Sequence, residues 1–262
     1  MAWSADSAYD KVWRVGANLK ALDAALMTYT ENDPHAITAH FEADTGWHSV
    51  CLLPRPPGPE FGLIVGEAVH NLRSALDHVA WQLANLDGVP ADPNGVQFPM
   101  LTSEPKDFYQ HRNVNGMREE HKAVLESLQP YKTSEANVWP VLAWLSNTDK
   151  HRTLHTTASV VSQLVPHALQ PHKGSEIAKA EFGYTGLLEG ETEIGRLLVY
   201  PKNPELQVHM QINPAIGVVF GERDSPIYGA DTSGYLKVLQ QLVEGVIDLF
   251  DRPGENGSPP WP

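Results

Sequence analysis

One helical segment organises this chain, and residues 66–83 of it read Gly66-Glu67-Ala68-Val69-His70-Asn71-Leu72-Arg73-Ser74-Ala75-Leu76-Asp77-His78-Val79-Ala80-Trp81-Gln82-Leu83. An apolar seam recurs every three or four residues, at Val65, Val69, Leu72, Leu76, Val79 and Leu83. At about 100° per residue, this spacing predicts a helix with one face turned to a core. The opposite side carries a polar stripe made of His70, Ser74, Asp77 and Trp81. A solvated helix face usually carries Lys and Glu, so the stripe suggests either a functional cleft or a second packing layer.

The flanking segments predict an α+β fold. Helical periodicity is expected at about residues 4–30, 60–86, 118–129, 135–150 and 231–250. Alternating apolar residues predict an early hairpin at 36–53 and several strands between about 153 and 222. We therefore expect a bundle of four to five helices packed with an antiparallel sheet, which the hairpin and the C-terminal-half strands form together. A single domain over residues 1–252 is the simplest division, followed by a disordered Pro- and Gly-rich tail at 253–262.

Composition limits the classes of function. The 262 residues carry a net charge of −13, which opposes broad binding to a nucleic-acid backbone but leaves room for RNA at a local site. The single cysteine, Cys51, excludes an intramolecular disulfide framework and a Cys-rich zinc site. Neither a signal peptide nor a membrane span is expected, so the predicted location is the cytoplasm. No motif names a cofactor.

A second polar cluster lies where helix is expected to give way to strand. It contains Asp149, Lys150, His151 and Arg152, after an apolar run at 138–145. One interpretation is a solvated helix end whose cations complement the helix dipole. The other combines an orienting carboxylate, a titratable imidazole and anion-binding cations. If this cluster packs beside the polar stripe, the two together supply an acid, a base and charge stabilisation.

Four motifs, taken together, resemble a bacterial family that is frequent in actinobacteria. They are residues 66–78, Phe98-Pro99, Leu128-Gln129-Pro130-Tyr131 and Asp149-Lys150-His151-Arg152. The match covers roughly residues 1–160, and the family brings no activity with it.

The segment from Arg73 to His78 is also similar to the Arg-x4-His signature of HEPN-type helical domains, many of which are dimeric, metal-independent endoribonucleases. This resemblance implies that His78 acts as general acid or base and that Arg73 holds the phosphate. In the ribonuclease hypothesis built on it, Asp77 or Asp149 orients an imidazole. The candidate catalytic residues are Arg73, His78, Asp77, His70, Asp149 and His151, and the candidate substrate-binding residues are Asn71, Ser74, Lys150 and Arg152.

Two other hypotheses stay open. A metal-dependent hydrolase would use nitrogen and oxygen ligands between helices, chiefly His70, His78 and His151, with Asp77 and His155 as further candidates. A non-catalytic binding or assembly protein would use the polar stripe as a symmetric homodimer interface. The sequence has no Gly-rich nucleotide motif, His-Glu-x-x-His motif or nucleophile elbow.

Overall fold

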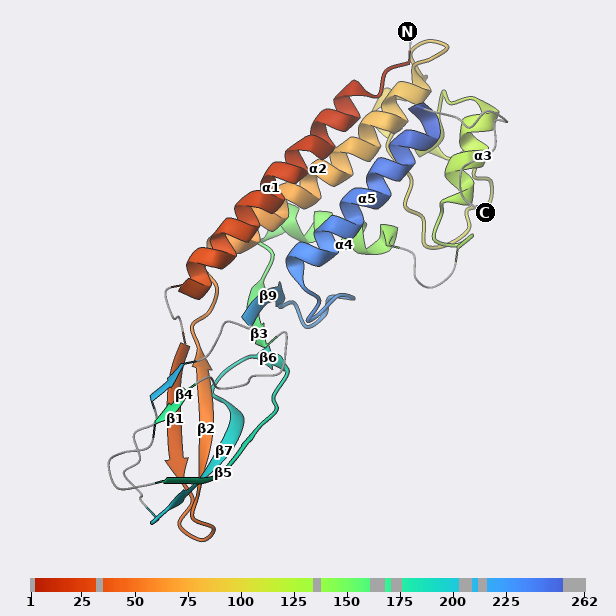
Figure 1. Ribbon diagram of the computed structural model, residues 1–262. Coiled ribbons are helices and arrows are strands. Elements are labelled where there is room, and N and C mark those ends of the chain that lie inside the picture. Colours follow the sequence, from red (N-terminus) through yellow and green to blue (C-terminus); the bar gives the residue numbers. More distant parts are fainter. Residues whose placement is uncertain are drawn as a thin grey trace. The chain divides into compact units, whose positions relative to one another are not determined.

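The computed structural model describes residues 3–31, 35–133, 138–160, 168–170, 176–202, 209–211 and 216–251 (Figure 1). Five α-helices and several antiparallel sheets make up this part of the chain, so the predicted α+β class is confirmed. The predicted disordered tail at 253–262 lies outside the described residues.

The chain separates into two compact units. The helical unit comprises Met1–Leu22, Gly62–Leu154 and Ser233–Pro262, and the strand unit comprises Asp23–Phe61 and His155–Thr232. The prediction of one domain over residues 1–252 stays a prediction, and each unit is described by itself below.

The α-helices are α1 (Asp6–Glu31), α2 (Pro59–Ala84), α3 (Glu119–Ser127), α4 (Trp139–His151) and α5 (Thr232–Asp251). In the helical unit α1, α2 and α5 run side by side (Figure 1). The seam of α2 behaves as predicted, because every one of its apolar side chains from Val65 to Leu83 is at most 1% exposed. Each such side chain stabilises the fold by about 1.5–3 kcal/mol relative to an exposed one, so α2 is the central element of this unit.

Polar contacts fix how the long helices align. The Asn18 amide of α1 donates to the Glu67 carboxylate of α2 at 2.9 Å. At the N-terminal side, the Trp3 indole N–H donates to Asp251 of α5 at 3.1 Å, and the Tyr9 hydroxyl bonds Asp248. A one-turn slip of α1 would move these donors by about 5.4 Å and so break all three bonds.

The strand unit contains three antiparallel sheets in the described residues. The largest has the order β1 (His35–Phe41), β2 (Trp47–Pro54), β7 (Thr192–Tyr200), β5 (Glu176–Phe182). A second sheet has the order β6 (Gly186–Leu188), β3 (Thr156–Val160), β9 (Ile216–Phe220), and β4 (Ala168–Gln170) pairs with β8 (His209–Gln211). The predicted hairpin does join later strands, as β2 pairs with β7. Its apolar side chains share one buried cluster with β3, β6 and β7, made of Val50, Leu52, Ala158, Leu188, Ile194, Leu197 and Val199.

No helix in the described part of the chain is both long and apolar enough to cross a membrane.

Candidate functional site

The polar stripe of α2 is only partly open to solvent. His70 is exposed, and Trp81 is 41% exposed, whereas Ser74 and Asp77 are half-buried. Asn71, a predicted substrate-binding residue, donates its amide to the Glu67 backbone carbonyl at 2.9 Å and so bonds within its own helix.

Two glycines on α2 bring the end of α4 against this helix. A Cβ atom at Gly66 would lie 2.0 Å from the Asp149 Oδ1 atom, and one at Gly62 would lie 2.3 Å from the Leu154 carbonyl oxygen. Because neither glycine has a Cβ, the α4 C-terminus and the residues after it pack directly on the α2 backbone. The two polar clusters identified in the sequence therefore meet in the helical unit.

His70 and Asp149 form the chemical centre of this junction. His70 lies one helical turn after Gly66, and its imidazole acts electrostatically on the Asp149 carboxyl. Burial raises the pKa of Asp149, while His70 works in the opposite direction. No hydrogen bond or ion pair joins the two side chains among the described residues, so His70 acts on the partly desolvated carboxylate through space.

The basic residues predicted for the site follow Asp149 directly in the sequence. The α4 helix ends at His151, and the Arg152 backbone N–H caps it by donating to the Thr148 carbonyl at 2.9 Å. Lys150, His151 and Arg152 are all exposed. They complement the negative end of the helix dipole, and they also place positive charge next to Asp149 along the chain.

Arg73 and Asp77 have a different environment from the one their motif suggests. They form an i,i+4 ion pair at 3.0 Å, and the Arg73 side chain is only 15% exposed. Arg73 donates to the Phe98 carbonyl at 2.9 Å, while Asp77 accepts from the Phe98 backbone N–H at 2.9 Å. The Met100 sulfur also contacts the guanidinium, at 2.8 Å. The Arg73–Asp77 pair thus bonds both the backbone carbonyl and the backbone N–H of Phe98.

Gln129 completes this arrangement from the end of α3. Its side chain is fully buried, accepts from the Leu101 N–H at 3.0 Å, and donates to the Pro99 carbonyl at 3.1 Å and the Leu125 carbonyl at 2.8 Å. We call Arg73, Asp77 and Gln129, with the loop 98–101 that they hold, the loop clamp. Sequence reasoning noted the motifs Phe98-Pro99 and Leu128-Gln129 but missed that a single hydrogen-bonded structure joins them.

His78 is held by another part of the chain. Its Nδ1 atom lies 3.2 Å from the Ser7 backbone carbonyl, so this nitrogen carries the proton of the hydrogen bond. Arg73 instead bonds the 98–100 loop. The two residues of the Arg-x4-His signature are therefore engaged by different segments.

The metal-ligand set suggested by the sequence does not assemble. In the described part of the chain, His70, His78 and His151 form no group whose ligand atoms converge. One group of three does converge there, made of His40, Cys51 and Glu191 in the strand unit.

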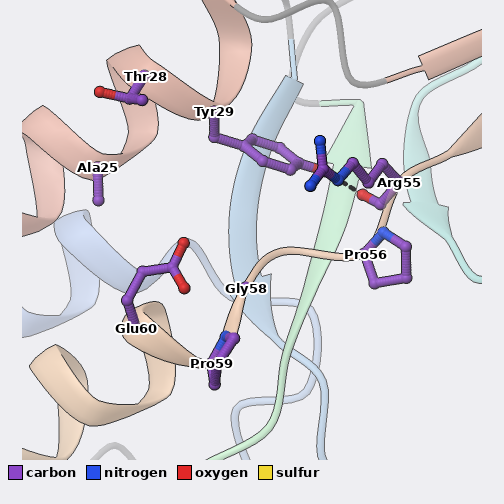
Figure 2. Close-up of a pocket in the computed structure, with 8 residues that line it drawn as sticks. All are labelled: Ala25, Thr28, Tyr29, Arg55, Pro56, Gly58, Pro59 and Glu60. Atoms are coloured by element: carbon purple, nitrogen blue, oxygen red, sulfur yellow. Dashed lines mark hydrogen bonds between the residues drawn. The ribbon is translucent and has the colours of Figure 1, made fainter.

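The strand unit also holds a pocket of about 510 Å³, which none of the predicted site residues lines (Figure 2). The lining residues are Ala25, Thr28, Tyr29, Arg55, Pro56, Gly58, Pro59 and Glu60. The Tyr29 hydroxyl donates to the Arg55 carbonyl at 2.5 Å, and burial raises the pKa of Tyr29 to about 12, with Arg55 opposing that shift. Tyr29 is thus a neutral wall of the pocket at physiological pH, with the charged Arg55 and Glu60 beside it.

No protein-family model, no curated protein and no solved structure matches this chain.

Proposed function

We propose that the chain is a metal-independent endoribonuclease in which His70 and Asp149 form the acid–base pair. The observation that carries this proposal is the close approach at Gly66, which holds the Asp149 carboxylate against α2 one turn from the exposed His70. The proposal keeps the reaction class implied by the HEPN resemblance and moves its centre from His78 to His70.

The environment of Asp149 supports a role beyond packing. Burial raises its pKa, so folding disfavours the charged carboxylate. No Lys or Arg pairs with it among the ion pairs found in the described residues. Ionisable groups whose burial costs free energy of folding are common in active sites, because their chemistry needs the desolvated environment.

The chemistry requires only side chains that lie at this junction. His70 takes the proton of a ribose 2′-hydroxyl, and Asp149 stabilises the imidazolium that forms. The 2′-oxygen then attacks the adjacent phosphorus and the bond to the 5′-oxygen breaks, leaving a 2′,3′-cyclic phosphate. The leaving oxygen takes up a proton from His151 or from water. Lys150 and Arg152 hold the anionic phosphate, as their charges suit.

In this proposal the Arg73–Asp77 pair positions the 98–101 loop and does not touch the phosphate. Its ion pair and its two bonds to Phe98 already occupy the groups that phosphate binding would need. The negative charge of the whole chain favours a short, locally bound RNA over a long duplex.

The test is cleavage of a fluorescent RNA oligonucleotide by the full chain in excess EDTA. His70→Gln and Asp149→Asn should each lower the rate by about 100-fold, the usual order for loss of an acid–base group. An oligonucleotide with 2′-deoxyribose at every position should resist cleavage, because it lacks the nucleophile.

Two further variants make the result decisive. His155→Gln changes an exposed histidine of the strand unit and should leave the rate unchanged. If His78→Gln abolishes cleavage while His70→Gln does not, the signature histidine is the catalytic one and our assignment is wrong. If the wild-type chain cleaves no RNA of mixed sequence, the ribonuclease proposal itself fails.

A further inference from the structure

Three side chains in the strand unit bring a nitrogen, a sulfur and an oxygen ligand together. The ring nitrogen of His40, the sulfur of Cys51 and a carboxylate oxygen of Glu191 all lie within 4.8 Å of one another. His40 belongs to β1, Cys51 to β2, and Glu191 immediately precedes β7. The adjacent positions of these strands in one sheet fix the three backbones relative to each other.

The strand register explains why these side chains share a face. Thr38 of β1 lies directly opposite Cys51 of β2, which in turn lies opposite Glu193 of β7. His40 follows Thr38 by two residues, and side chains two residues apart along a strand point to the same side of the sheet. Strand pairing therefore places His40 and Cys51 on this side of the sheet, and Glu191 joins them from the bend just before β7.

Hydrogen bonds already engage all three groups. The His40 Nε2 atom lies 2.9 Å from the Glu191 Oε1 atom, and the Thr38 hydroxyl donates to the same oxygen at 2.7 Å. Ser49 hydrogen-bonds the Cys51 sulfur. The Thr38 and Ser49 hydroxyls lie outside the ligand set, and outer partners of this kind hold metal ligands in place and tune their basicity.

We propose that His40, Cys51 and Glu191 bind a divalent cation of the zinc class, with a water molecule as the fourth ligand. Zn²⁺ takes Cys, His and carboxylate ligands, and mixed sets of three protein ligands that leave one position open are a known pattern. This inference concerns the strand unit and does not rest on the proposed ribonuclease site.

The distances fit with small side-chain movements. A tetrahedral ion with bonds of about 2.0–2.3 Å needs ligand atoms about 3.4–3.8 Å apart. Closing the group from 4.8 Å requires shifts of about 1 Å, which rotation about the side-chain bonds provides. The His40 and Glu191 side chains are 56% and 45% exposed, so they can turn and solvent ions can reach them.

Local charge favours a cation at this site. The Glu191 carboxylate is itself a ligand, and Glu193, which lies opposite Cys51 in the strand register, adds a second negative charge next to the sulfur. On binding, the ion replaces the proton of the Cys51 thiol, which passes to solvent, and the sulfur bonds the metal as a thiolate.

Cobalt(II) titration of the full, untagged chain tests the site. Because Cys51 is the only cysteine, a thiolate-to-cobalt charge-transfer band reports this one residue. We expect one equivalent of Co²⁺ to produce the band and Zn²⁺ to displace it. Cys51→Ser should remove the band, and His40→Gln and Glu191→Gln should each weaken binding at least about tenfold.

His155→Gln serves as the matched control, since it removes an exposed histidine elsewhere in the strand unit and should change neither band nor affinity. Absence of the band at about 100 µM Co²⁺ would overturn the proposal. So would a band with unchanged affinity in both His40→Gln and Glu191→Gln, because Cys51 would then bind the ion without them. Circular dichroism of each variant verifies that the sheet is intact. If a glutamine variant fails to fold, alanine at the same position replaces it.

Discussion

Replacing Gly66 with alanine should move the Asp149 carboxylate while leaving the stability of the chain nearly unchanged. The new Cβ atom would lie 2.0 Å from the Asp149 Oδ1 atom, whereas ordinary contacts begin near 3.4 Å. The carboxylate must therefore retreat by about 1.4 Å, the difference between these distances. The atoms in the way belong to a side chain, so the α2 backbone need not move.

The expected effect on function is large, whereas the expected effect on stability is small. A displacement of about 1 Å in a catalytic group can lower a rate by about 100-fold, and we expect a loss of that order in RNA cleavage. Alanine in place of a helical glycine stabilises by up to about 1 kcal/mol, which offsets the cost of moving the carboxylate. The free energy of unfolding should thus stay within about 1 kcal/mol of the wild-type value.

The assay combines cleavage kinetics, urea unfolding and an NMR titration of the Asp149 carboxyl. As the carboxylate moves toward water, its raised pKa should fall toward the ordinary value, since burial is the cause of the shift. Gly16→Ala in α1 is the control, because a Cβ there meets nothing within 4 Å. An unchanged Asp149 pKa and an unchanged rate in Gly66→Ala would show that the close approach does not position this carboxylate, and would refute the reasoning.

Three further predictions concern the loop clamp and the charge of Asp149. Gln129→Leu leaves the Leu101 N–H and the Pro99 carbonyl buried without their partner, and should lower the free energy of unfolding by about 2–4 kcal/mol in urea denaturation; a change below about 0.5 kcal/mol would contradict it. Arg73→Lys keeps the charge but loses the planar donors that reach Asp77 and the loop, and should cost about 1–2 kcal/mol in the same measurement while sparing cleavage. Because the pKa of Asp149 is raised by folding, its ionisation destabilises the fold above that pKa and has no effect below the pKa of the unfolded chain. Asp149→Asn should therefore gain stability relative to the wild type between pH 3 and pH 7, and a relative loss over that range would show the carboxylate to be a stabilising group.

The fold was largely predictable, because periodicity is a local property of the sequence. The seam of α2 and the early hairpin produce clear periods of 3.6 and 2, and both were placed within a few residues. The strands after residue 153 were predicted only as a group, because strands as short as β4 and β6, with three residues each, show no clear period of their own. The described part of the chain also has short 3-10 turns at Pro93–Gly95 and Arg112–Val114, between the helices predicted at about residues 60–86 and 118–129.

The site was predictable in its residue types but not in its pairings. The histidines and carboxylates of the two polar clusters stand out in the sequence, yet nothing local indicates that Asp149 rests on Gly66. A glycine inside a helix signals only that some backbone or side chain approaches closely there. The convergence of His40, Cys51 and Glu191 was hidden for a similar reason, because strand pairing brings together residues about 150 positions apart.

The loop clamp also has a consequence for how the chain opens. The segment between α2 and α3 has little regular structure, and such segments normally exchange their amide hydrogens within seconds or minutes. Here the Phe98 amide is bonded to Asp77 of α2, and the Leu101 amide is bonded to Gln129, two residues after α3. Their exchange requires the clamp to break, so this irregular segment belongs to the same cooperative unit as the central helix. A stretch that resembles a surface loop in sequence thereby shares the slow opening of the core.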